Sequence, residues 1–96
     1  MEATHMVRPA YQTVAIATVE LVEKLHHLLP GVVVQSSEPY EDEDICLTVY
    51  GGWEGEELQH IRHKIYELEF AIYDKYAVEA MVKALPLTYL PEPKSL

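Results

Sequence analysis

The chain has 96 residues, of which 49% are hydrophobic and 24% charged, and its 7 Lys and Arg against 16 Asp and Glu give a formal net charge of −9. This length fits one small domain with a single two-layer core and excludes a multidomain enzyme. The hydrophobic fraction is too high for a disordered chain, and no apolar run reaches the roughly 18 residues that a membrane helix needs. We therefore expect no membrane partner, and because the acidity opposes contact with phosphate backbones, we expect no nucleic acid either.

The ends of the chain and its one cysteine suggest a simple cytoplasmic domain. Cys46 has no second cysteine with which to form an internal disulfide, and no basic-then-apolar signal segment opens the sequence. Residues 1–6 lack periodicity and resemble a cloning junction, so we expect the domain to occupy residues 7–85. The proline-rich residues 86–96 favour an extended tail.

The first predicted element is an amphipathic helix from Tyr11 to Leu29. Its apolar residues recur every three or four positions, at Val14, Ala17, Leu21, Leu25 and Leu28. Pro30-Gly31 ends it, because proline cannot continue the hydrogen-bond ladder. The β-branched residues 32–34 then predict a first strand, and residues 45–50 predict a second. The two strands should form an antiparallel hairpin with a long acidic connection.

A second helix is predicted from Glu56 to about Lys75, with acids in its first turn and a lysine in its last, as the helix dipole favours. Its aliphatic stripe comprises Leu58, Ile61, Ile65, Leu68 and Ile72. A neighbouring sector holds the aromatic residues Tyr66, Phe70 and Tyr73, separated from that stripe by Arg62 and Glu69. Two apolar sectors need two partners, so we expect the aromatic sector to meet the first helix, the tail or a second subunit.

Alternation of apolar and polar residues from Val78 to Lys83 predicts a third strand, with a continuing helix as the alternative. The order helix, strand, strand, helix, strand then predicts an α+β two-layer sandwich. In it a three-stranded mixed sheet carries both helices on one face, because the second helix makes the crossover to a parallel third strand.

The connection before the second strand is strongly acidic, and no Lys or Arg occurs from Leu25 through Ile61. We expect this loop to take part in partner binding together with the nearby Trp53. The acids concerned are Glu38, Glu41, Asp42, Glu43 and Asp44. Such a loop suits a basic protein surface, mimicry of a nucleic-acid backbone or a hard divalent cation, and the alternative is a solvated loop. For Trp53 the alternative is a side chain that covers the edge of the core.

The segments Leu25–Val49 and Ile72–Glu79 resemble the core of minimal nucleotidyltransferases of the DNA-polymerase-β type. The resemblance extends over roughly residues 21–82, mostly through the apolar pattern, and implies the same topology. The family's phosphate-gripping Gly-Ser pair and its metal-binding acids would correspond to Ser36 or Ser37, then Asp44 and Cys46, then Glu79. The glycine is missing and a cysteine replaces the second aspartate, so the resemblance implies a degenerate domain that retains nucleotide or Mg²⁺ binding.

One stripe of the second helix combines histidines with carboxylates. Glu56, His60, His63 and Glu67 follow at steps of four, three and four residues, which places them within about 60° of one another. Such residues can bind Zn²⁺, and the alternative is a solvated face with i,i+4 pairs.

The sequence contains no Ser-His-Asp signature, Walker motif or dinucleotide-binding glycine pattern, so we assign no catalytic residue and no cofactor. We therefore expect a non-catalytic acidic protein that acts through protein contacts, as a homodimer or as the small subunit of a complex. The contact surfaces should be the acidic loop with Trp53 and the aromatic sector. The degenerate nucleotidyltransferase-like domain is the alternative.

Overall fold

The computed structural model describes residues 9–39 and 42–91. In chain order it contains α1 (Tyr11–Leu28), β1 (Val33–Ser37), β2 (Ile45–Gly51), α2 (Gly55–Tyr76), β3 (Ala80–Pro86) and a short 3₁₀ turn (Leu87–Tyr89). This is the expected helix-strand-strand-helix-strand order, and the α+β fold class is confirmed.

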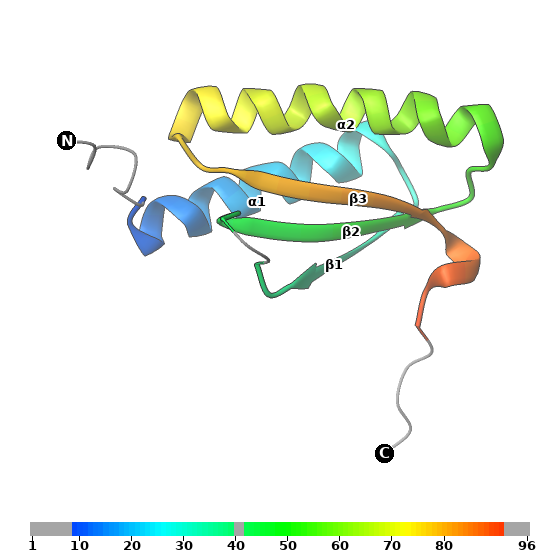
Figure 1. Cartoon of the computed structure of the whole chain (residues 1–96), viewed down its shortest axis with the longest axis horizontal. Coiled ribbons are helices and arrows are strands. Elements are labelled where there is room, and N and C mark those ends of the chain that lie inside the picture. The colour runs from blue at the N-terminus through cyan, green and yellow to red at the C-terminus, as the bar shows by residue number, and fades with distance from the viewer. Residues whose placement is uncertain (1–8, 40–41, 92–96) are drawn as a thin grey trace, which may run out of the picture.

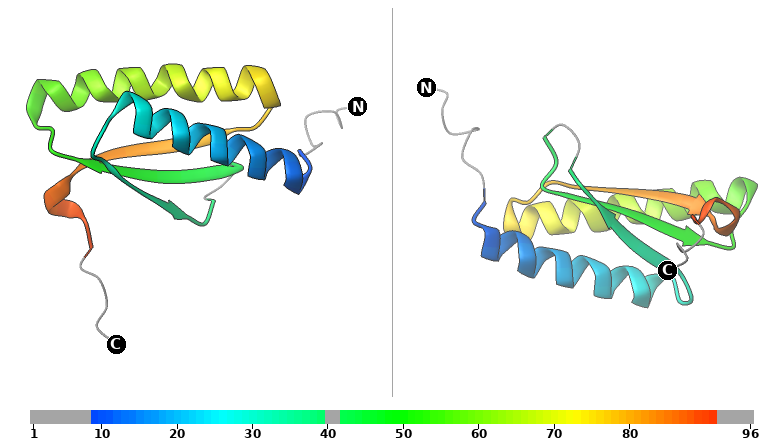
Figure 2. Two further views of the ribbon diagram at one scale, coloured as in Figure 1. Left: turned by 180° about the vertical axis from the view of Figure 1, so that it is seen from behind. Right: turned by 90° about the horizontal axis from the view of Figure 1, so that it is seen from below.

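The three strands form one mixed sheet in the order β1-β2-β3. β1 pairs antiparallel with β2, with Val34 opposite Val49 and Ser37 opposite Cys46. β3 pairs parallel with β2, with Val82 opposite Leu47. Both helices cover the same face of this sheet, and α2 runs alongside the edge strand β3 (Figures 1 and 2). The predicted two-layer sandwich is therefore the architecture of the described residues.

The core lies between the helices and the sheet. Its largest fully buried side chains are Leu21, Leu25, Leu47, Val49, Ile72 and Val78. β2 is central, so both its neighbours and the helices shield it from water. On β3 the even-numbered residues Ala80, Val82 and Ala84 pack against this core. Because side chains alternate along a strand, Met81 and Lys83 face the side of the sheet that carries no helix.

The two helices end within one residue of the predicted positions, for identifiable reasons. After α1, the chain turns through Pro30 and Gly31, and Gly31 has a φ of 83°, a conformation that glycine adopts without steric cost. α2 ends with Ala77 in the left-handed conformation, and the Ala77 N–H donates to the Tyr73 carbonyl.

The largest differences from the expected boundaries are in the two edge strands. β1 begins one residue later than predicted and continues through Gln35 to Ser37, because its pairing with β2 outweighs the weak strand propensity of serine. β3 begins at Ala80, two residues later than predicted, and extends to Pro86. Residues 87–89 form a 3₁₀ turn where the sequence predicts an extended tail. The predicted junction at residues 1–6 and the end of the tail at 92–96 lie outside the described residues.

Candidate functional site: a groove between α2 and β3

A groove of about 740 Å³ runs between α2 and the outer edge of β3. Its lining includes the aromatic residues Tyr66, Phe70 and Tyr73 from the helix and Met81, Val82 and Lys83 from the strand. The three rings remain 61%, 69% and 49% exposed, respectively, although each is large and mostly apolar. The structure thus brings the whole predicted aromatic sector into one groove and leaves it without a partner among the described residues.

The edge of β3 is hydrogen-bonded to two side chains of α2. The Val82 backbone N–H donates to a Glu69 carboxylate oxygen at 2.8 Å, and the Arg62 guanidinium donates to the Ala84 carbonyl at 3.3 Å. Arg62 and Glu69 lie seven positions apart on α2, which is close to two full turns. They take the place that a fourth strand's backbone would occupy and so reduce the exposure of unpaired edge groups.

Charge is distributed unevenly along the groove. Glu43 and Glu79 line the end where β3 begins, whereas Arg62 and Lys83 line the part toward its other end. Glu69 lies between them and is half-buried, and the loss of surrounding water raises its pKa above the usual 4.5, while the Val82 N–H opposes that rise. One carboxylate oxygen of Glu43 is buried without a hydrogen-bond partner in the described part of the chain.

The predicted acidic loop divides into residues with different environments. Glu38 and Asp42 are exposed, and Glu41 lies outside the described residues. Asp44 instead joins the start of β2 to the start of β3, because its carboxylate accepts the Glu79 N–H at 3.0 Å and its own N–H donates to the Glu79 carbonyl at 2.8 Å. This part of the loop therefore holds the sheet together.

Trp53 lies in the hydrophobic core and leaves little side-chain surface for a partner. Its side chain is only 8% exposed and belongs to the hydrophobic core. The indole ring packs directly over Gly51, where the absence of a side chain leaves room for it. The expected partner-binding role of Trp53 is therefore corrected, and the ring covers the edge of the core.

The histidine stripe lies on the solvent side of α2. Glu56, His60, His63 and Glu67 are all exposed. Within residues 9–39 and 42–91, no group of three or more His, Cys, Asp or Glu side chains is arranged to hold a metal ion. The Zn²⁺ site therefore remains a hypothesis from spacing alone.

The positions named by the nucleotidyltransferase resemblance gather at one end of the sheet. Ser37 pairs with Cys46, and Asp44 is hydrogen-bonded to the backbone of Glu79. Cys46 is buried, whereas Ser37 and Glu79 are exposed. Cys46 cannot supply the oxygen ligand that Mg²⁺ prefers.

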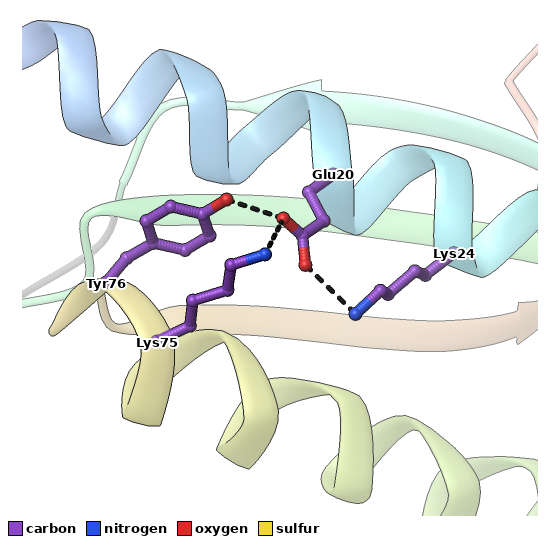
Figure 3. Close-up of polar contacts among 4 residues, drawn as sticks. All are labelled: Glu20, Lys24, Lys75 and Tyr76. Carbon is purple, nitrogen blue, oxygen red and sulfur yellow. Dashed lines mark hydrogen bonds and ion pairs between the residues drawn. The ribbon is translucent and has the colours of Figure 1, made fainter.

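A polar cluster between the helices was not foreseen from the sequence (Figure 3). Glu20 of α1 accepts hydrogen bonds from the Tyr76 hydroxyl and from the Lys75 ammonium, the latter at 2.9 Å, and it also pairs with Lys24 at 2.9 Å. These donors, with Tyr76 the largest contributor, lower the pKa of Glu20 from 4.5 to about 2. The hydrogen bonds that Tyr76 and Lys75 each donate to Glu20 raise the pKa of both groups. The i,i+4 spacing of Glu20 and Lys24 is visible in the sequence, but the contact with α2 depends on the packing of the helices.

Comparison with known proteins gave no match to a protein-family model, to a curated protein or to a solved structure. Neither α1 nor α2, the α-helices of the described residues, has a stretch long and apolar enough to cross a bilayer.

Proposed function

We propose that this protein acts without catalysis, through protein–protein contacts made at the groove between α2 and β3. The observation that carries the proposal is the exposure of Tyr66, Phe70 and Tyr73 side by side in one groove. Aromatic side chains bury large areas and dominate the energetics of many protein interfaces, and they are enriched at interface centres.

The groove has the anatomy of a contact surface. Its lining combines the apolar rings with charged side chains, among them Glu79, Arg62 and Lys83. A hydrophobic centre with a polar surround is typical of protein interfaces. At the edge of β3, an extended chain could pair with the Val82 and Ala84 backbone groups if it replaced the Glu69 and Arg62 side chains that now bond to them.

Photocrosslinking tests the proposal without requiring knowledge of the partner. We would replace Phe70 by the photoreactive p-benzoylphenylalanine in cells that express the protein, and place the same residue at Tyr11 as the matched control. Tyr11 is 93% exposed and lies on α1, away from the groove. We expect a discrete adduct from position 70 that is absent from position 11 and is lost when Tyr66→Glu is added.

The masses of the adducts decide the outcome. A discrete adduct at position 70, with this chain or with another protein, supports a contact surface in the groove. Equal and diffuse labelling from positions 70 and 11, or no adduct at position 70, would refute it.

A further inference from the structure

We infer that the partner in the groove is a second copy of this chain, whose β3 pairs antiparallel with the first β3 about a two-fold axis through Val82. This inference rests on the proposed function and names its partner. It follows from three features that share one centre: the edge of β3, the aromatic rings of α2 and the order of charges along the groove.

The backbone of β3 sets the register of the pairing. The Val82 N–H and the Ala84 carbonyl both point away from β2, toward α2. Since backbone groups alternate in direction along a strand, those of Ala80, Val82 and Ala84 all face outward. Two edge strands related by a two-fold axis run antiparallel. An axis through Val82 places Ala80 opposite Ala84 of the second copy. It uses the three outward-facing residues of β3 that can both donate and accept, since Pro86, the fourth, has no N–H.

The same axis places the aromatic rings against their counterparts. Glu69 accepts a hydrogen bond from the Val82 N–H at 2.8 Å, which places this part of α2 beside the proposed axis. Phe70 therefore lies near the axis, and Tyr66 faces Tyr73 of the second copy, because the two are nearly equidistant from it along the helix. Rings that are half to two thirds exposed in one chain would then cover one another. Backbone groups of the second β3 would replace Glu69 and Arg62 at the strand edge.

In this register, the positive charge on β3 of one copy lies near the negative charge of the other copy. Lys83 lies directly opposite Met81 of the second copy and diagonally opposite its Glu79, on the face of the sheet without helices. The pair is repeated by symmetry. An axis through Lys83 would instead oppose two lysines. An axis through Met81 would set Lys83 directly opposite Glu79 but would place Ala84 opposite Val78, outside β3. The charges and the outward-facing backbone groups together therefore favour the axis through Val82.

Sedimentation equilibrium of the purified protein tests whether the groove joins two copies. We expect a monomer–dimer equilibrium that Phe70→Glu weakens by about a hundredfold or more, because each dimer carries this central substitution twice. Phe70 is 69% exposed in the single chain, so thermal unfolding should show an intact fold. The matched control Tyr11→Glu should leave the dimer unchanged.

A charge swap tests the register. Lys83→Glu sets two carboxylates against each other in its own dimer, and Glu79→Lys sets two ammonium groups against each other, so each variant alone should dimerise about tenfold or more weakly. An equimolar mixture restores opposite charges across the interface and should recover the dimer as a heterodimer. Both side chains are exposed, so neither change disturbs the core.

The results separate this inference from the proposed function. A protein that stays monomeric at the highest concentration, or a dimer that is insensitive to Phe70→Glu, overturns pairing of two copies in the groove. A dimer that Phe70→Glu disrupts but the charge-swap mixture does not restore overturns the strand register. A monomer whose position-70 probe captures one different protein in cells overturns the second copy as partner while the proposed function stands.

Discussion

Gly51→Ala tests whether Trp53 belongs to the core or to a contact surface. Gly51 is the last residue of β2, and a Cβ placed there would meet atoms of the Trp53 ring at less than contact distance. The ring is 8% exposed and packed within the core, so it cannot move aside as a flexible surface side chain would. The substitution must therefore displace either the ring or the end of the strand.

The expected cost is that of inserting one methyl group into a packed core, about 1–3 kcal/mol. For a domain of this size each kcal/mol lowers Tm by about 4–8 °C, so Gly51→Ala should lower Tm by roughly 5–20 °C. Gly52→Ala is the matched control, because a Cβ at Gly52 has nothing within 4 Å. Its effect on the free energy of unfolding should stay within about 0.5 kcal/mol.

Circular dichroism measures the two melting curves, and fluorescence reports on the ring itself, since Trp53 is the only tryptophan of the chain. We expect the Gly51→Ala emission to shift to longer wavelength relative to Gly52→Ala, as the ring gains contact with water. Equal Tm values and equal emission maxima for the two variants would refute the packing of Trp53 over Gly51. They would also return Trp53 to the set of contact residues.

Three further predictions concern ionisable groups. The lowered pKa of Glu20 means that its hydrogen bonds stabilise the fold above about pH 4.5 and lose that contribution as pH falls toward about 2. The Tm difference between the parent protein and Glu20→Gln should therefore be constant near neutral pH and disappear as the pH falls toward about 2. The raised pKa of Glu69 has the opposite effect on stability, because burying the ionised carboxylate destabilises the fold above the usual pKa of 4.5. Glu69→Gln, whose amide oxygen can still accept from the Val82 N–H, should therefore raise Tm at neutral pH, and the gain should shrink on acidification. Zn²⁺ should leave the Tm of both the parent and His60→Ala unchanged, since the exposed His60 and His63 gather no third ligand from the described residues.

Each of these measurements has an outcome that contradicts its reasoning. A Glu20→Gln difference that persists at pH 2 would show that Glu20 does not act through its charge. A Glu69→Gln protein that is less stable at neutral pH would show that the bond to Val82 outweighs the burial cost. A saturable rise in Tm with Zn²⁺ that His60→Ala removes would establish the metal site that the helical spacing suggests.

The architecture could be predicted because its signals are local. The apolar periods of α1 and α2 and the Pro30-Gly31 turn are readable in the sequence, and the parallel arrangement of β3 follows from the crossover through α2. The aromatic sector could be separated from the aliphatic stripe by helical geometry alone. The position of this sector beside the edge of β3 could not be predicted, because it depends on the rotation of α2 about its own axis when Ile61, Ile65 and Ile72 pack onto the sheet.

The missed features depend on contacts between distant segments. In the sequence, Arg62 and Glu69 only separate two apolar sectors of the helix. In the structure they bond to β3, thirteen or more positions later in the chain. Trp53 sits among acids and glycines, a setting typical of a loop, and nothing local shows that Gly51 makes room for its ring. Asp44 likewise belongs to a charged run in the sequence, but its neighbours in space are the backbone groups of Glu79.

Ionic strength distinguishes a second copy from a basic partner at the groove. Two chains of net charge −9 repel each other, by an amount on the order of a few kcal/mol when the Debye length is about 30 Å at 0.01 M salt. At about 0.15 M the Debye length falls to about 8 Å, which screens this general repulsion more than it screens close pairs such as Lys83 with Glu79. Self-association should therefore tighten between these two salt concentrations, whereas binding of a basic protein to the acidic chain should weaken. Sedimentation equilibrium at both concentrations measures the change, and a dimer that weakens steadily with added salt would contradict pairing driven by the aromatic groove.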